Sequence, residues 1–341
     1  MCAMNSLTGN GVADGAVLES VEECCIHLLG APPDSIDYPG GKSRKSIRVW
    51  VSGQSFILSS RRSEGRAQLE AGVLHELHKA GAPVPELLVQ HGKWVVQKDL
   101  GDNRLSIALN SVAEHDQEAL LGKVLESIEA YQLAAMHTGL GARVAEIGQT
   151  EEWNMKFAQA PMRLAGELSM KLPKYPVADV ASLLKIEQPQ FIKWDARLGN
   201  ALLDDQQRVY WIDWEHAGKR HPMDDVAWML GDEYMPELDP VVEARLIDAA
   251  MRMLGCSEKD LPYFFLMGTL HMTIRLALIV DRKADKDWWD PDKCMQLDHI
   301  GVVKKQAITL ARRASRWCEI APCIKSLQPF YDELVAYIEK Q

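Results

Sequence analysis

Two neighbouring stretches decide the fold of this chain: Phe191-Ile-Lys193-Trp-Asp195-Ala-Arg197-Leu-Gly-Asn200 and Val209-Tyr-Trp-Ile-Asp213-Trp-Glu215-His-Ala-Gly218. Both begin with short apolar runs rich in aromatic and β-branched residues, which favour strands. The polar residues 204–208 separate them and are typical of a turn. The sequence therefore predicts a hairpin formed by 191–203 and 209–213, with its acidic and amide side chains near the strand ends.

Three polar residues in these stretches have the chemistry needed for phosphoryl transfer. Asp195 and Asn200 are close in sequence, and Asp213 ends the second predicted strand. Transfer from a nucleotide needs a carboxylate that orients or deprotonates the acceptor hydroxyl. It also needs oxygen ligands that hold Mg²⁺ on the phosphates. These three residues can supply both.

The rest of the chain divides into a strand-rich beginning and a helical remainder. Short strands are predicted at 47–51, 55–58 and 94–97, with one helix around 69–77 between the second and third strands. After Gly101 apolar residues recur at helical spacing. The long helical segments are 118–136, 241–254, 263–280 and 302–318. We therefore expect an α+β fold in which a small sheet lobe, 1–98, precedes a larger helical lobe, 99–341.

Composition and charge exclude several classes of protein. The 341 residues include 47% hydrophobic and 25% charged residues, which is ordinary globular composition. A formal net charge of -10 disfavours nucleic-acid binding, because proteins that follow a phosphate backbone are usually basic. The most apolar stretch, 263–280, contains His271 and Arg275, so we expect a core helix and no membrane partner.

The cysteines and the N-terminus indicate an ordinary intracellular protein. Seven cysteines are scattered along the chain without a Cys-x-x-Cys pair or a zinc-like histidine spacing, so we expect buried apolar side chains. Residues 1–16 are polar and glycine-rich and lack the apolar run of a secretory signal. We expect a cytoplasmic protein with no required protein partner.

The motifs resemble those of the aminoglycoside phosphotransferase and choline kinase family of protein-kinase-like enzymes. That family carries a catalytic loop ending in Asp-x-x-x-x-Asn, an Asp-Trp-Glu segment and a later Pro-x-x-Asp. The matching stretches here are 193–200, 212–218 and 222–227. The resemblance implies a two-lobed kinase fold, ATP and Mg²⁺ as cofactors, Asp195 as catalytic base and Asn200 and Asp213 as metal ligands. Asp225 would brace the catalytic loop.

The resemblance continues upstream to about residue 35. Gly40-Gly41-Lys-Ser43 is similar to the phosphate-binding loop of the family, in which backbone N–H groups approach phosphate oxygens. Glu70 occupies the position of the helix glutamate that pairs with a phosphate-binding lysine. The segment containing Gln97 and Asp99 matches the hinge that binds adenine through backbone groups. The residues leave ATP and GTP both open.

The sequence departs from the family pattern at two cations. The lysine expected on the sheet falls near Ser59, and Arg61, two residues later, is the candidate replacement, with Lys45 and Arg48 as alternatives. Lys193 replaces the catalytic-loop histidine. Arg197, two residues after Asp195, is placed to neutralise charge on the transferred phosphoryl group.

These observations favour a kinase that phosphorylates a hydroxyl of a small molecule, such as an amino sugar, an aminoglycoside or a choline-like alcohol. The alternative is a catalytically weak pseudokinase that binds nucleotide and has a regulatory role, which the missing lysine motivates. Acidic and aromatic residues cluster after Asp213, and a cationic acceptor would suit them. The expected pocket residues are Trp214, Glu215, Asp224, Trp228, Asp232 and Glu233.

Overall fold

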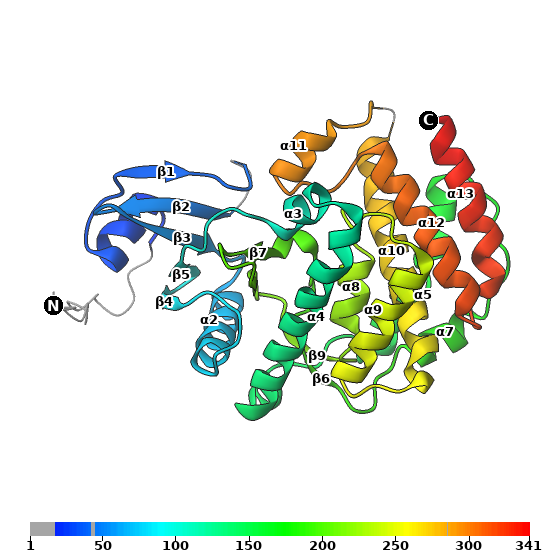
Figure 1. The fold of residues 1–341 in the computed structure, drawn as a ribbon, viewed down its shortest axis with the longest axis horizontal. Coiled ribbons are helices and arrows are strands. Elements are labelled where there is room, and N and C mark those ends of the chain that lie inside the picture. Colours follow the sequence, from blue (N-terminus) through cyan, green and yellow to red (C-terminus); the bar gives the residue numbers. More distant parts are fainter. Residues whose placement is uncertain (1–17, 42–44, 285) are drawn as a thin grey trace.

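A computed structural model describes residues 18–41, 45–284 and 286–341. Its N-terminal part is an antiparallel sheet with the strand order β1-β2-β3-β5-β4 (Figure 1). The strands are β1 Ser35–Asp37, β2 Ser46–Val51, β3 Gln54–Ser60, β4 Leu87–His91 and β5 Trp94–Lys98. The three central strands confirm the sequence prediction. The two edge strands were missed, because β1 is wholly exposed and β4 buries little, so neither shows a buried alternation.

The predicted helix between the strands is α2, Glu64–Lys79, and it is longer than its apolar spacing indicated. Ser63 caps its N-terminus by accepting a hydrogen bond from the backbone N–H of Arg66. Its buried face contacts β4 and β5 and is apolar except for Glu70, which is fully buried. A charged residue on a buried helix face needs a partner, and this one points toward the junction with the helical part.

The predicted hairpin is partly wrong. β7 Ala201–Leu203 pairs with β8 Val209–Trp211 as expected. However, the apolar run that begins at Phe191 is not one strand, because β6 Gln190–Ile192 pairs instead with β9 Gly218–Arg220. The chain between β6 and β7 leaves the sheet direction through Trp194 and Asp195, both of which have left-handed backbone angles. The interruption turns Asp195 and the polar residues after it out of the strand and into a loop.

The short helix α1 Val21–Cys24 lies against the N-terminal sheet. The helices of the remaining chain lie together at the other end of the molecule in Figure 1. They are α3 Leu105–Ser111, α4 Glu114–His137, α5 Glu151–Ala158, α6 Ala160–Glu167, α7 Val177–Leu183, α8 Asp224–Leu230, α9 Pro240–Met253, α10 Leu261–Lys283, α11 Pro291–Gln296, α12 Lys304–Ile320 and α13 Gln328–Lys340. The four long predicted helices are confirmed as α4, α9, α10 and α12. Their shorter neighbours α5 to α8 were not predicted.

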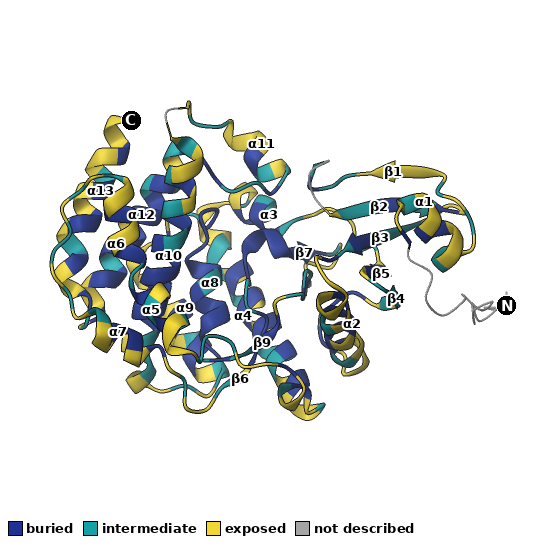
Figure 2. Cartoon of the chain, turned by 180° about the vertical axis from the view of Figure 1, so that it is seen from behind, coloured by how far each residue is buried: buried dark blue, intermediate teal, exposed yellow. Residues whose placement is uncertain are grey.

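The segment Glu258–Lys283, which contains α10, is long and apolar enough to span a bilayer, but 72% of its most hydrophobic window is buried inside the protein. It packs against α6, α8 and α12, so it is the central helix of the helical part. Figure 2 shows the buried residues gathered along these helices. Four of the six described cysteines are buried and two are half-buried, as expected, whereas Cys2 lies outside the described residues.

Candidate active site

The candidate site is built on the loop between β6 and β7. Asp225, at the start of α8, holds this loop: its carboxylate accepts hydrogen bonds from the backbone N–H groups of Lys193 (2.7 Å) and Trp194 (2.8 Å). The hydroxyl of Tyr131 donates a third, at 2.6 Å. These bonds offset the strain of the left-handed residues that follow. Burial raises the pKa of Asp225 to about 6, against the effect of its three donors.

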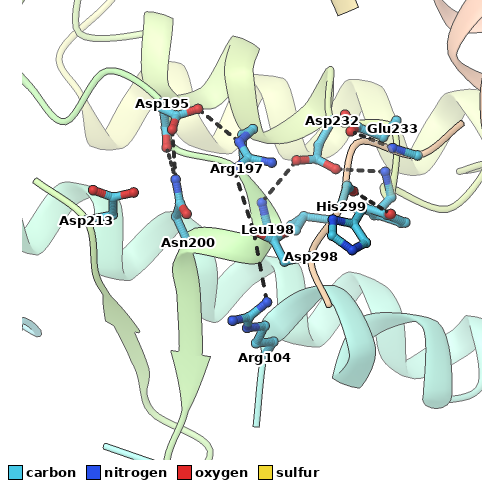
Figure 3. A network of polar contacts seen from close by, with 12 residues as sticks. Arg104, Asp195, Arg197, Leu198, Asn200, Asp213, Asp232, Glu233, Asp298 and His299 are labelled. Carbon is cyan, nitrogen blue, oxygen red and sulfur yellow. Dashed lines mark hydrogen bonds and ion pairs between the residues drawn. The ribbon is translucent and has the colours of Figure 1, made fainter. Parts of the chain in front are cut away.

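Asp195 projects from this loop with both carboxylate oxygens held (Figure 3). Arg197 Nε donates to Oδ1 at 3.0 Å, and Asn200 Nδ2 donates to Oδ2 at 2.9 Å. The same Nδ2 also donates to the backbone carbonyl of Asp195. The three residues predicted from one short stretch are therefore in direct contact, and the carboxylate has a fixed orientation.

Lys193 joins this loop to the one that carries Asp213. Its Nζ donates to the backbone carbonyl of Asp213 at 2.7 Å and to that of Asp195 at 3.3 Å. The side chain is fully buried, and burial lowers the pKa of the ammonium although nearby Asp195 and Asp213 oppose the effect. Lys193 therefore joins the two loops that carry Asp195 and Asp213, and its Nζ donates to backbone carbonyls in both.

Arg61 reaches the site from just beyond the end of β3. Its guanidinium forms two hydrogen bonds with Glu70, which confirms the predicted pair. Arg61 Nη1 also lies 3.0 Å from Asp213 Oδ1. Burial disfavours the charged forms of Arg61 and Asp213, but the attraction between the opposite charges outweighs it. The pKa of Arg61 is therefore raised and the pKa of Asp213 is lowered. A fixed cation thus lies where the family lysine would be expected to act.

The two alternative cations have other positions. Arg48 Nε donates to Asp99 at 2.6 Å, so this arginine fastens β2 to the hinge segment. Lys45 lines the cleft described next. Arg61 is therefore the cation that has both a buried acidic partner and contact with Asp213.

A cleft of about 340 Å³ lies between the sheet and the helical part. Of the residues predicted from sequence, it is lined by Gly40, Lys45, Arg48, Arg61, Gln97, Asp99, Asn200, Asp213 and Glu215. Gly41 has a φ of 83°, a conformation that favours glycine, and Ser43 lies outside the described residues. The apolar Ile57 and Leu202 line the cleft from the sheet and the helical part. The arrangement suits a flat apolar group between the lobes and an anion near Arg61.

The donor set at one end of this cleft fits a magnesium ion. Asp213 Oδ1 is buried and accepts no hydrogen bond from the described residues, although Arg61 is close. Asn200 and Asp213 supply amide and carboxylate oxygens, which are the ligands Mg²⁺ prefers. Asp213 has a left-handed backbone, with a φ of 62°, which turns its side chain out of the line of β8.

The predicted acidic acceptor pocket is wrong in its main residues. Asp224 is fully buried and bound to Arg220 Nε at 2.8 Å, and Trp214 is a core residue whose indole N–H donates to a backbone carbonyl. Glu233 is buried against Arg275, which holds the pKa of Glu233 down to about 2 although burial opposes it. Glu215 lines the cleft instead, with its Oε1 3.4 Å from Arg61 Nη1. Asp224 and Glu233 are therefore each paired with an arginine inside the protein.

Asp232 belongs to the frame of the catalytic loop. Its carboxylate accepts hydrogen bonds from the backbone N–H groups of Leu198 (3.2 Å) and Tyr234 (2.7 Å). Burial, reinforced by the neighbouring Glu233, raises the pKa of Asp232 to about 7. Trp228, half-buried, packs instead against Trp194 and His271. Asp232 is therefore used to hold the backbone of the loop, and Trp228 is packed against other aromatic rings.

One residue of the cleft was not predicted. Asp298 lines the cleft and lies beside Arg197 and Arg104, although about a hundred residues separate it from the catalytic loop.

A second group of residues that was not predicted lies away from the cleft. Ligand-type atoms of His221, Cys256 and Asp260 lie within 4.8 Å of one another. His221 Nδ1 accepts a hydrogen bond from the backbone N–H of Met223, and its Nε2 lies 3.3 Å from Asp260 Oδ1. This second group joins two turns through its own hydrogen bonds.

Comparisons with known proteins agree with this geometry. The sequence matches the model of the phosphotransferase enzyme family over residues 37–256. No curated protein matches it. One similar structure is the choline kinase LicA from Streptococcus pneumoniae, at 12% identity and a TM-score of 0.50, covering 86% of this chain and 98% of that one.

Two further structures have TM-scores of 0.52. Amicoumacin kinase hAmiN, in complex with AMP-PNP, Ca²⁺ and Ami, is 11% identical and covers 82% of this chain and 89% of its own. Aminoglycoside phosphotransferase APH(4)-Ia, in a ternary complex with AMP-PNP and hygromycin B, is 15% identical and covers 86% and 99%. These likenesses confirm the predicted kinase-like fold. Since the family match spans more than half of the sequence and contains the motifs from Gly40 to Asp225, the chain belongs to the phosphotransferase enzyme family.

Proposed function

We propose that this protein transfers the terminal phosphoryl group of ATP to a hydroxyl of a small molecule. The observation that carries the proposal is that one cleft combines a buried cation, Arg61, with Asp213 and Asn200, next to an Asp195 carboxylate fixed by two donors. Such sites catalyse mainly by positioning and electrostatic stabilisation. The nucleotides in the related structures support ATP as the donor.

In the proposed reaction, the oxygen of the acceptor hydroxyl bonds to the terminal phosphorus of ATP, and Asp195 accepts the proton of that hydroxyl. The bond from that phosphorus to the oxygen of ADP breaks, and ADP leaves with the bonding electrons. Asn200 and Asp213 would hold Mg²⁺, which neutralises charge on the phosphates. Arg61 would bind the phosphates that remain on ADP, and Glu70 orients Arg61 for this role.

The acceptor is proposed at the level of class. Relatives that are named as choline and aminoglycoside kinases support a small hydroxylated molecule such as an amino sugar, an aminoglycoside or a choline-like alcohol. The internal pairing of Asp224 and Glu233 removes the acidic pocket on which a preference for cations rested. The aromatic side chains beside Asp195 remain as a surface for the apolar face of such a molecule.

The pseudokinase alternative rested on a missing lysine. The Arg61 and Glu70 pair supplies a cation in that region, and Lys193 supports the backbone of both loops, so neither departure favours a protein that has lost activity. A binding-only protein has no physical need for an Asp195 held in a defined orientation.

Slow ATP hydrolysis by the purified protein with MgCl₂ tests the proposal, followed by a panel of small alcohols and sugars that should accelerate ADP release. Asp195→Asn should lower both rates by about 10² or more, because it removes the general base. The matched control is Asp205→Asn in the exposed turn between β7 and β8, which should retain wild-type rates. If the wild type, Asp195→Asn and Asp205→Asn all bind nucleotide but show the same negligible turnover, the proposed enzyme activity is contradicted and the pseudokinase hypothesis is favoured.

A further inference from the structure

The strongest unassigned feature is the segment after α11, where Leu297 and Asp298 cross toward the cleft. Leu297 side-chain atoms lie 3.8 Å from the position a Cβ would take on Gly41, so this segment reaches the predicted phosphate loop. Asp298 then turns onto the catalytic loop, with a left-handed φ of 48°. One short stretch from the C-terminal helices thus approaches both nucleotide-side loops.

Asp298 packs directly on the catalytic loop. A Cβ added to Gly199 would lie 1.8 Å from Asp298 Oδ1 and 2.5 Å from its Cγ, so the carboxylate occupies space that a side chain at residue 199 would need. Asp298 is 5% exposed. A carboxylate buried this closely against a loop requires cationic or hydrogen-bonding neighbours.

Two of those neighbours are arginines. Arg197 Nη2 lies 3.7 Å from Asp298 Oδ2, while Nε of the same guanidinium donates to Asp195. Arg104 Nη1 lies 4.0 Å from Asp298 Oδ2, and Arg104 Nη2 donates to the backbone carbonyl of Pro39 at 3.5 Å. Figure 3 shows this chain of contacts running from Asp195 through Arg197 and Asp298 to Arg104.

We propose that Asp298 is a positioning residue for the phosphotransfer reaction, acting by holding the Arg197 guanidinium against Asp195. Arg197 carries one charge between two carboxylates, and its planar fork allows it to face both. Without Asp298, the Arg197 guanidinium loses one of the carboxylates that fix its position, so its hydrogen bond to Asp195 Oδ1 weakens and Asn200 becomes the main donor that orients the Asp195 carboxylate. Arg61 and Gln97, the proposed ATP-binding residues, line other parts of the cleft, and Arg61 keeps its pair with Glu70.

This inference rests on the proposed function, and two readouts keep the two separable. The first is ATP hydrolysis with MgCl₂. Asp298→Asn should lower kcat by about tenfold to a hundredfold, the cost of a small misplacement at a reacting centre, while KM for ATP stays within about twofold. In an Arg197→Ala background, Asp298→Asn should cause no further loss, because the two residues act as one unit.

The matched control is Asp290→Asn at the opposite end of α11. Asp290 is exposed and caps α11 by accepting a hydrogen bond from the Lys293 N–H, and asparagine can keep this cap, so the change removes one carboxylate without altering the contacts of Arg197. It should leave kcat near the wild-type value. If Asp298→Asn does not fold, Arg197→Lys tests the same link, because one ammonium cannot face both carboxylates and the same loss in kcat is expected.

The second readout is hydrogen exchange of the peptide covering 195–200, which does not depend on activity. Asp298→Asn should accelerate the exchange of this peptide, and Asp290→Asn should not. Arg197→Ala should accelerate it as well, and the double variant Arg197→Ala with Asp298→Asn should exchange no faster than Arg197→Ala alone. If the wild type fails to hydrolyse ATP, the proposed function fails and exchange alone decides the inference. The inference would be overturned if Arg197→Ala and Asp298→Asn changed the rates by independent factors that multiply in the double variant. It would also be overturned if Asp298→Asn behaved like the control Asp290→Asn.

Discussion

The buried pair of Arg61 and Glu70 allows the structural and the functional role of one cation to be separated. Glu70 is fully buried and accepts hydrogen bonds from the Arg61 guanidinium and, at 3.3 Å, from the backbone N–H of Trp214. The perturbations are Arg61→Met alone and Arg61→Met combined with Glu70→Met. The first leaves a carboxylate with one weak donor, and the second leaves an apolar pair of similar volume.

The expected magnitudes differ between folding and binding. Breaking a buried pair by removing one partner costs about 3–5 kcal/mol, whereas replacing both with apolar residues is close to neutral. Arg61→Met should therefore lower the free energy of unfolding by that amount, and the double variant should recover most of it. The affinity for MgATP should fall in both, by about tenfold to a hundredfold, since one charge-assisted bond to phosphate is lost.

Urea unfolding followed by tryptophan fluorescence measures the stabilities, and calorimetric titration with MgATP and with adenosine measures binding. Adenosine carries no phosphate, so its affinity should be unchanged in the double variant. The reasoning is refuted if the double variant binds MgATP as the wild type does, or if it loses the same factor for both ligands. Recovery of stability without recovery of MgATP affinity is the result expected.

Three further predictions concern the proposed metal ligand Asp213, the glycine beside Asp298 and a buried histidine. Asp213→Asn should reduce magnesium-dependent ATP hydrolysis by about 10² or more without changing the circular dichroism spectrum, because a charged ligand is lost from a partly exposed site; unchanged magnesium dependence would contradict the ligand assignment. Gly199→Ala should lower the free energy of unfolding by about 1–3 kcal/mol through overlap with Asp298, and adding Asp298→Ala should restore part of it in urea titrations. Burial, with Arg220 and Arg275 nearby, holds the pKa of His271 well below its usual value, so the unfolded chain takes up a proton that the fold does not. The free energy of unfolding should then fall by about 1.4 kcal/mol per pH unit below pH 6.5, and His271→Phe should remove this component; an unaltered slope in pH-dependent denaturation would contradict a neutral His271.

The parts of the site that could be predicted are those set by local spacing. Asp195 and Asn200 share one loop, and Arg61 lies two residues after the position where a lysine was expected, so proximity along the chain carried the prediction. Which acids remain open to a substrate depends instead on burial and on partners that the fold supplies. Glu233 pairs with Arg275 on α10, and this pairing has no signal in the order of residues. Arg220 lies only four residues before Asp224, but that spacing alone does not show that both side chains are buried.

The same distinction applies to the fold. Central strands and long helices have a periodic apolar pattern, whereas the edge strand β1 and the short helices α5 to α7 are fixed by what they pack against. Asp298 could not be predicted, because a left-handed residue in a connecting loop meets the catalytic loop only once α10 and α12 have assembled.

The packing of α10 against α8 sets a limit on how this protein can be divided or recombined. The family match ends at residue 256, yet α8, which carries Asp225, is covered by α10, and α10 in turn packs on α12. A gene fragment that ends where the family match ends would leave the apolar face of α8 in water and would be insoluble on expression. Chimeras that exchange acceptor preference between relatives therefore need a junction before α8 or after α13, so that these helices are inherited together.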